Sequence, residues 1–202
     1  MDKIKAVIFD FGGVLIDWSP YHLYRKVLTN DTEIERLLQD IHFREWNYSF
    51  DQGYPLARGI SEMCRQYPER ADLIHLYDER WLETLGSTFD ANIALVKAVK
   101  AAGTHVYGLS NWSDEKFNVV RPRFEFFDLF EDIVVSGTVK IAKPDPRIYQ
   151  LLLDRNHLKA EECIYIDDSE DNIRTGRQLG LHCIHYQSSQ ILRQELKAYG
   201  VL

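Results

Sequence analysis

Four polar groups in this 202-residue chain could together do chemistry. They are Asp10, Ser110–Asn111, Lys143 and Asp167–Asp168. An aspartate carboxylate can act as a nucleophile that divides a displacement into the formation and the hydrolysis of a covalent intermediate. Asp10 is the candidate for that role, because it ends an apolar run and precedes two glycines that let the backbone approach a ligand closely. Taken singly, aspartate, serine and asparagine are ordinary turn formers, so the prediction depends on their combination.

Attack by a carboxylate on a phosphate group requires positive charge, because both reactants are anions. Magnesium prefers carboxylate, carbonyl and phosphate oxygens, and Asp10, Asp168 and the Gly12 carbonyl could supply such ligands. Crowded carboxylates also raise one another's pKa, which is a second reason to expect the metal or Lys143 among them. Lys143 would neutralise the charge that develops on the transferring group.

Ser110 and the backbone N–H groups at Asn111 lie just before a helix that Ser113 is expected to cap. The free N–H donors and the dipole at a helix start favour a phosphate group. We therefore expect Ser110 to take part in catalysis, and both Ser110 and Asn111 to bind substrate.

An alternation of short apolar runs with amphipathic segments predicts an α/β fold with a parallel sheet between two layers of helices. Residues 6–9 are apolar, β-branched and closed by glycines, which is typical of a strand buried on both faces. Further strands are expected at 104–109, 133–135, 163–166 and 181–185, with helices between them. The carboxyl ends of such strands face one crevice, so the four polar groups should meet there.

The segment from Trp18 to Gly86 has a helical pattern instead, and nothing between Tyr21 and Leu85 has a convincing strand pattern. Apolar spacing predicts helices at about 20–28, 31–41, 56–63 and 74–85. The polar and aromatic stretch at 45–53 lies between two of them. Within it, Asn47, Tyr48 and Asp51 are the side chains expected to meet a small polar substrate.

The composition limits the possible partners. The formal net charge is -7 and there is no cluster of lysine or arginine, which argues against nucleic acid or an acidic membrane surface. Cys64, Cys163 and Cys183 lack metal-ligand spacing, so we expect reduced thiols in a cytoplasmic protein. No apolar run is long enough to cross a membrane, and the charged N-terminus does not look like a signal peptide. The expected state is a monomer or a weak homodimer.

The four groups, in this order and spacing, resemble the motifs of the haloacid dehalogenase superfamily. The matching segments are Phe9-Asp10-Phe11-Gly12-Gly13-Val14-Leu15, Leu109-Ser110-Asn111, Lys143-Pro144-Asp145 and Asp167-Asp168. The resemblance implies a Rossmann-like three-layer core with strand order 5-4-1-2-3, formed by residues 1–17 and 87–202. It also implies a helical cap at 18–86, inserted after the first motif. Within the superfamily, the chain is similar to the N-terminal domain of soluble epoxide hydrolase and to bacterial sugar-phosphate phosphatases.

The resemblance implies a magnesium-dependent phosphatase that acts on a small phosphorylated metabolite, such as a sugar phosphate, through an aspartyl-phosphate intermediate. Asp168 would then be a direct metal ligand. Asp167 would lie behind the ligands and orient water or Lys143.

One position departs from the family pattern. Phosphatases of the family usually carry a second aspartate two residues after the nucleophile, and this second aspartate acts as general acid and base. In this chain the corresponding residue is Gly12. Proton transfer by such a group contributes about a hundredfold to ten-thousandfold. Turnover could therefore be slow, limited to good leaving groups, or assisted by Asp17, Glu45 or Asp51.

Two alternatives remain open at this stage. A 2-haloacid dehalogenase needs neither a second aspartate nor a metal. Lys143 and Tyr149 have the spacing found in those enzymes, and a cap arginine (Arg25, Arg44 or Arg58) could hold a carboxylate. Those enzymes lack the acidic pair, because unneutralised carboxylates would repel both nucleophile and substrate. The other alternative is a protein that binds a phosphorylated ligand with little turnover, because Gly12 replaces the acid.

Overall fold

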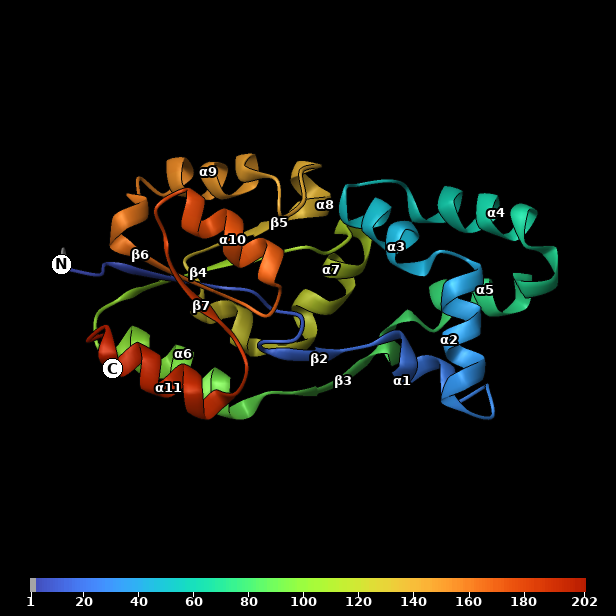
Figure 1. Cartoon of the computed structure of the whole chain (residues 1–202), viewed down its shortest axis with the longest axis horizontal. Coiled ribbons are helices and arrows are strands. Elements are labelled where there is room, and N and C mark those ends of the chain that lie inside the picture. The colour runs from blue at the N-terminus through green and yellow to red at the C-terminus, as the bar shows by residue number, and fades with distance from the viewer. Residues whose placement is uncertain (1–2) are drawn as a thin grey trace.

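The computed structural model describes residues 3–202, so residues 1 and 2 of the expected core segment 1–17 lie outside the described part. Five parallel strands form the central sheet in the order β5-β4-β1-β6-β7 (Figure 1). Their bounds are β1 Ala6–Phe9, β4 His105–Ser110, β5 Asp132–Val135, β6 Cys163–Asp167 and β7 His182–His185. If these five strands are renumbered 1 to 5 along the chain, their order across the sheet is 3-2-1-4-5. This is the expected order 5-4-1-2-3, read from the opposite edge of the sheet. The predicted Rossmann-like α/β fold is confirmed.

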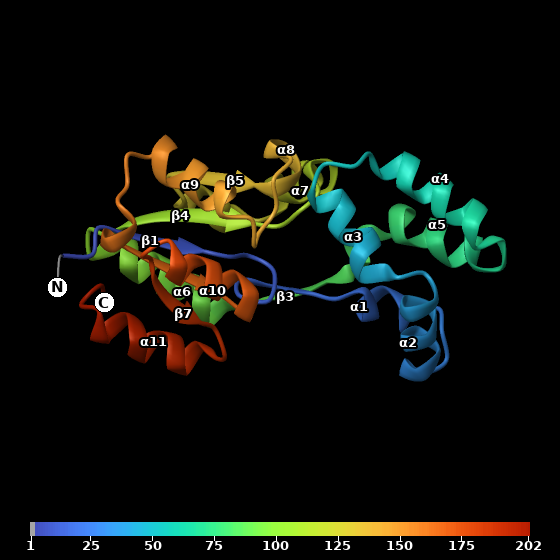
Figure 2. The same ribbon diagram turned by 45° about the horizontal axis from the view of Figure 1, so that its top comes forward.

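Helices cover both faces of this sheet, as buried parallel strands require. In β1, Val7 and Phe9 join an apolar cluster with α6 and α11, whereas Ala6 and Ile8 join a second cluster with α9 and α10. Figure 1 shows α9 and α10 on one side of the strands and α6 and α11 on the other, and Figure 2 shows α9 and α11 on opposite sides. The bounds are α6 Asp90–Ala101, α9 Pro146–Arg155, α10 Glu170–Gln178 and α11 Ser189–Ala198.

The strand register aligns the ends that carry the polar groups. Phe9 of β1 pairs with Gly108 on one side and with Ile166 on the other. Asp10, Ser110 and Asp167 therefore emerge from adjacent strands at one edge of the sheet, as predicted.

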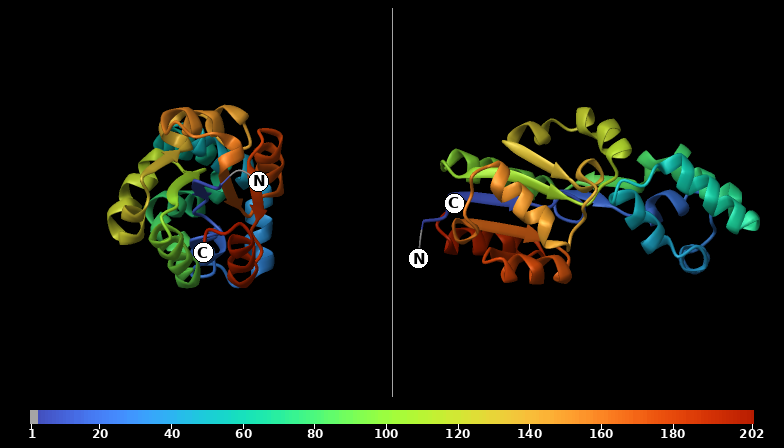
Figure 3. Two further views of the ribbon diagram at one scale, coloured as in Figure 1. Left: turned by 90° about the vertical axis from the view of Figure 1, so that its left-hand side faces the viewer. Right: turned by 90° about the horizontal axis from the view of Figure 1, so that it is seen from above.

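Residues 20–84 form a helical insert that lies beyond this edge (Figures 1 and 3). Its helices are α1 Pro20–Tyr24, α2 Asp31–Asp40, α3 Phe43–Asp51, α4 Leu56–Gln66, η1 Pro68–Arg70, α5 Ala71–Glu79 and η2 Trp81–Thr84. Two short antiparallel strands, β2 Ile16–Trp18 and β3 Leu85–Thr88, connect it to the core. The remaining helices are α7 Asp114–Val120, α8 Ser136–Val139, η3 Arg121–Arg123, η4 Glu125–Leu129 and η5 Ala160–Glu162. Within residues 3–202, no helix combines the length and apolar character needed to span a bilayer.

The sequence analysis did not predict helix α3, which covers Phe43–Asp51 and therefore most of the polar and aromatic stretch at 45–53. Phe43, Trp46 and Phe50 are buried at helical spacing and pack against one another and Tyr77. The pattern was hard to read because aromatic residues, asparagine and serine have modest helix propensity. The expected helix at 20–28 ends earlier, at Tyr24, and the strands β2 and β3 were not predicted.

Candidate active site

Lys143 lies buried at the carboxyl edge of the sheet, with 1% of its surface exposed. Its Nζ lies 3.0 Å from Oδ1 of Asp10 and 2.6 Å from Oδ2 of Asp167, and it donates to the Leu109 carbonyl at 2.9 Å. The ammonium thus joins the ends of β1, β4 and β6. An ion this deeply buried is stable only when it is paired and hydrogen-bonded, as it is here.

The Asp167 carboxylate is fully occupied by its neighbours. Besides Lys143, it accepts hydrogen bonds from the Tyr165 hydroxyl, the Asn172 amide (3.0 and 3.1 Å) and the Ser169 backbone N–H (2.8 Å). Burial alone would raise the pKa of Asp167, but Lys143 and these donors outweigh it and lower the pKa below its usual value. Asp167 is therefore held as an anion that orients the Lys143 side chain.

The negative charge of Asp10 is less well compensated by neighbouring donors than that of Asp167. Its Oδ1 accepts the Phe11 backbone N–H at 2.7 Å in addition to its contact with Lys143. Burial raises the pKa of Asp10 to about 7; Lys143 opposes this shift, and the charges of Asp167 and Asp168 add to it. Three carboxylates thus lie around one ammonium, which leaves negative charge that a cation would neutralise.

These carboxylates suit a magnesium ion chemically. Oxygens of Asp10, Asp167 and Asp168 lie within 4.8 Å of one another. Because Asp167 is already occupied, Asp10 and Asp168 are the carboxylates able to hold the ion, and hard oxygen donors are what Mg²⁺ prefers. Partial desolvation, followed by the charge of Asp167, raises the pKa of Asp168, although this residue is exposed overall.

The two glycines after Asp10 have different structural roles. Gly13 has a φ of 73°, and a Cβ there would overlap the Asp168 carboxylate. Gly12 has no positive φ, and a Cβ there would meet no atom within 4 Å. Gly13 therefore provides the tight turn and the close approach, whereas the space beside Gly12 is open.

Ser110 and Asn111 occupy the predicted place at the end of β4. Ser110 is buried with 1% of its surface exposed. The Asn111 side chain is committed to Lys143: its Oδ1 accepts the Lys143 backbone N–H at 2.8 Å, and its Nδ2 donates to the Lys143 carbonyl at 2.9 Å. Asn111 thus fixes the loop that presents the lysine, and its predicted binding of phosphate rests on its backbone N–H.

Helix α3 brings Asn47, Tyr48 and Asp51 to the same edge of the sheet. The Tyr48 hydroxyl donates to the Lys143 carbonyl at 3.2 Å, and Asn47 Oδ1 accepts from the Tyr77 hydroxyl at 2.5 Å. Asp51 makes neither an ion pair nor a hydrogen bond with the residues at 3–202. The structure therefore brings together the core and insert residues that the sequence singled out.

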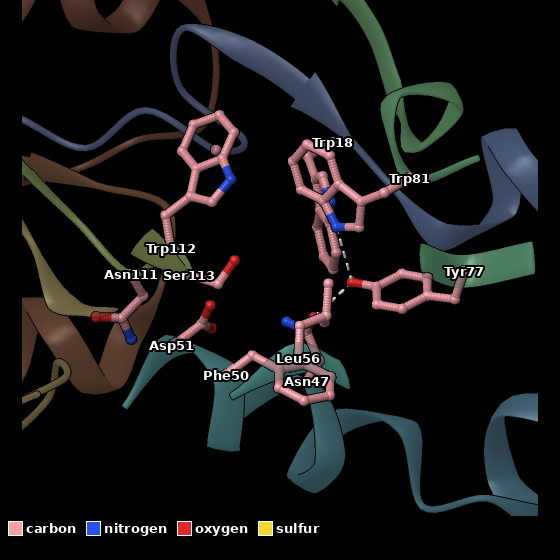
Figure 4. Close-up of a pocket in the computed structure, with 11 residues that line it drawn as sticks. Trp18, Asn47, Phe50, Asp51, Leu56, Tyr77, Trp81, Asn111, Trp112 and Ser113 are labelled. Atoms are coloured by element: carbon pink, nitrogen blue, oxygen red, sulfur yellow. Dashed lines mark hydrogen bonds between the residues drawn. The ribbon is translucent and has the colours of Figure 1, made fainter. Parts of the chain in front are cut away.

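Two cavities lie between the sheet edge and the helical insert. The inner pocket has a volume of about 100 Å³, and five of its eleven lining residues are aromatic (Figure 4). Its lining is Gly12, Trp18, Asn47, Phe50, Asp51, Leu56, Tyr77, Trp81, Asn111, Trp112 and Ser113. The outer cavity, of about 740 Å³, is lined by Trp18, Pro20, Phe43, Arg44, Glu45, Asn47, Tyr48, Asp51, Asn111, Lys143, Pro144, Asp168, Ser169, Asp171 and Asn172.

Sequence reasoning missed the aromatic lining of the inner pocket. Neither Trp81 nor Trp112 was singled out as a candidate site residue. The Trp112 Nε1 is buried and has no hydrogen-bond partner in the described part of the chain. The position of Trp112 next to Ser110–Asn111 was the one available signal.

Known proteins with similar sequences include two phosphatases and a cyclase. A sesquiterpene phosphatase of Aspergillus oryzae is 27% identical over 199 residues, covering 96% of this chain and 95% of that protein. A D-ribitol-5-phosphate phosphatase of Bacteroides thetaiotaomicron is 22% identical, with 96% and 97% covered. A drimenol cyclase of Aspergillus calidoustus is 26% identical over 98% of this chain, but the chain spans 37% of that longer protein.

Among solved structures, the fold is similar to that of a HAD family enzyme of Bacteroides thetaiotaomicron. One of its crystal structures is an alanine mutant in complex with magnesium and inorganic phosphate. The TM-score is 0.71 at 22% identity, covering 91% of this chain and 94% of that one. The family model of a haloacid dehalogenase-like hydrolase matches residues 4–180, which include all four motifs. The chain therefore belongs to the haloacid dehalogenase-like hydrolases.

Proposed function

We propose that this hydrolase is a magnesium-dependent phosphatase that acts on a small phosphate ester through an aspartyl-phosphate on Asp10. The observation that carries the proposal is the charge arrangement around Asp10. Lys143 is already shared with Asp167, so Asp10 and Asp168 together retain negative charge beside the outer cavity. A dehalogenase would have to bring an organic acid to the same carboxylates, which would repel it. The phosphatase names of relatives that match nearly the full chain agree with the proposal.

In the proposed mechanism, the Asp10 carboxylate attacks phosphorus and the bond to the ester oxygen breaks. Lys143 keeps Asp10 ionised and neutralises charge on the transferring group, while Asp167 and Leu109 hold the ammonium in place. Ser110 and the Asn111 backbone would bind the phosphate oxygens. Asp10, Asp168 and the Gly12 carbonyl would hold the magnesium ion, which supplies further positive charge to the phosphate. Water then hydrolyses the acyl phosphate and restores Asp10.

We further propose that residues 18–86 act as a cap and that the inner pocket receives the leaving group. Its volume of about 100 Å³ is smaller than a cavity of roughly 150 Å³ that binds benzene. It therefore accepts only a group smaller than a sugar ring, such as a short alkyl or hydroxyalkyl group, and the Trp112 Nε1 can donate to a substrate oxygen. A longer leaving group would extend into the outer cavity past Asn47 and Tyr48.

The alternative of a 2-haloacid dehalogenase finds less support in the geometry. The Tyr149 hydroxyl donates to the Asn172 carbonyl at 3.1 Å, and its ring packs edge-on against Tyr165. Of the three arginines considered for holding a carboxylate, Arg25 pairs with Asp31, and Arg58 pairs with Glu62. Only the third, Arg44, lines the outer cavity.

The test is phosphate release from a panel of sugar, polyol and isoprenoid monophosphates, with magnesium and with excess chelator. We expect turnover that requires magnesium and is abolished in Asp10→Asn, because an amide is not an effective nucleophile. Chloride release from 2-chloropropionate without phosphate release would assign the dehalogenase alternative. Ligand binding without turnover of any substrate would assign the binding protein.

A further inference from the structure

The site lacks a proton donor in the position where phosphatases of this family usually have one. Gly12 lines the inner pocket, and the direction of its absent Cβ leads into open space. Loss of an alkoxide without protonation is slow, and a positioned acid contributes about a hundredfold to ten-thousandfold. An acidic side chain from another part of the protein could supply the proton instead, if it reaches the inner pocket.

Of the three acids considered from the sequence, the structure brings one to that pocket. Asp17 forms an ion pair with His22 at 2.9 Å in the connecting strand β2. Glu45 is exposed and lines the outer cavity but not the inner pocket. Asp51, the last residue of α3, lines both cavities together with Asn111, and Figure 4 shows its carboxyl group directed into the inner pocket.

We propose that Asp51 is the general acid and base of this enzyme, supplied by the cap in place of the aspartate that Gly12 replaces. The inference rests on the proposed phosphatase function.

Contacts on either side of Asp51 hold it against the core. The preceding turn of α3 is fixed by the hydrogen bond from Tyr48 to the Lys143 carbonyl. The chain then turns at Gly53, which has a φ of 83° and where a Cβ would lie 2.9 Å from the Gly137 carbonyl of α8. The Leu56 N–H next donates to Glu115 of α7 at 3.0 Å. These contacts restrain the position of Asp51 relative to the core, as a catalytic group requires.

The electrostatic surroundings of Asp51 suit proton transfer near neutral pH. Burial raises the pKa of Asp51 to about 7; Lys143 opposes this shift and Asp10 adds to it. The titratable groups that face it from the insert are Tyr48 and Tyr77, both with a pKa above the usual value and therefore uncharged near pH 7. A general acid works best when its pKa is close to the working pH.

The proposed hydrolysis has two chemical steps. In the first, Asp10 forms a bond to phosphorus, the ester P–O bond breaks, and the Asp51 carboxyl gives its proton to the departing oxygen. In the second, the Asp51 carboxylate takes a proton from water as the water oxygen bonds to phosphorus. The acyl P–O bond then breaks, which releases inorganic phosphate and leaves Asp10 ionised and Asp51 protonated for the next cycle.

The test compares Asp51→Asn with the wild type on acetyl phosphate, phenyl phosphate and glycerol 2-phosphate. The alkyl ester needs the proton most, so Asp51→Asn should lose about a hundredfold to ten-thousandfold in kcat on it and much less on acetyl phosphate. The wild-type limb of the pH profile that requires protonated Asp51 should also disappear. Glu45→Gln, an acid-to-amide change on the same helix, should keep the wild-type dependence on leaving group.

A second variant tests the same idea by rescue. Gly12→Asp combined with Asp51→Asn should restore part of the rate on glycerol 2-phosphate, because the space beside Gly12 accepts a side chain. Equal losses on all three substrates, or no loss, in a folded Asp51→Asn that still binds magnesium would overturn the role of Asp51. A wild type that releases no phosphate from any ester would instead refute the phosphatase function itself.

Discussion

Replacing Asp51 by asparagine should stabilise the fold, and the gain should depend on pH. The pKa of Asp51 rises from its ordinary 3.8 to about 7 because the carboxyl is buried. A carboxyl with a higher pKa in the folded protein than in the unfolded chain opposes folding once it ionises. This cost is absent below pH 3.8, grows between pH 3.8 and about 7, and is complete above that.

The size of the effect follows from the shift. About three pKa units at about 1.4 kcal/mol each give an upper limit of about 4 kcal/mol. About two of those units lie between pH 5 and 7, and the side chain keeps some contact with water, which reduces the cost. We therefore expect the advantage of Asp51→Asn over the wild type to grow by roughly 1–2 kcal/mol between pH 5 and 8.5, or about 2–8 °C in Tm.

The assay is urea unfolding at pH 5, 6, 7 and 8.5 in chelator, with Glu45→Gln as the matched control on the same helix. The control should show no comparable trend, because Glu45 is exposed. An Asp51→Asn advantage that is constant with pH, or that shrinks as pH rises, would refute the placement of this carboxyl in a desolvated site. A variant that is more stable but slower is the expected trade-off at a residue kept for function.

Three further outcomes test the site. Magnesium should raise the Tm of the wild type by mass action, and Asp168→Asn should lose most of that shift together with activity; undiminished turnover in excess chelator would contradict this. Gly13→Ala should cost about 1–2 kcal/mol in urea unfolding, because its backbone is left-handed and a Cβ meets Asp168, whereas Gly12→Ala should cost little. Asn47→Ala should remove the acceptor of the Tyr77 hydroxyl proton, at a cost of about 1–3 kcal/mol, while the hydroxyl still accepts from Trp81 Nε1. The same variant should change substrate preference more than the rate on acetyl phosphate; equal losses on all substrates would count against binding through the cap.

The sheet could be predicted from the sequence because each core strand has a pattern that few other structures share. Ala6–Phe9 is apolar on both faces and ends in glycines, and the other strands follow helices with clear caps such as Asp145. Once the strands are parallel, their carboxyl ends meet at one edge, so the grouping of Asp10, Lys143 and Asp167 follows from the order of elements alone.

The inner pocket could not be predicted in the same way, because it depends on how the insert packs against the core. Helix α3 was not predicted, because the aromatic residues, asparagine and serine that form it have modest helix propensity. The acid that shares the inner pocket with Gly12 likewise depends on the tertiary structure and could not be identified from the sequence. Asp17, Glu45 and Asp51 are equivalent in the sequence, and the ion pair of Asp17 and the exposure of Glu45 are visible only in three dimensions.

Placing the acid on the cap changes what controls the reaction. When the nucleophile and the acid both lie on the core, the cap decides only which substrate enters. Here Asp10 is on the core and Asp51 on α3, so the complete pair forms only while Tyr48 and Leu56 keep the insert docked against Lys143 and α7. Docking also desolvates Asp51, so the same contact that brings the acid to the substrate raises its pKa to about 7. Breaking that contact by Tyr48→Phe should therefore slow alkyl phosphates more than acetyl phosphate.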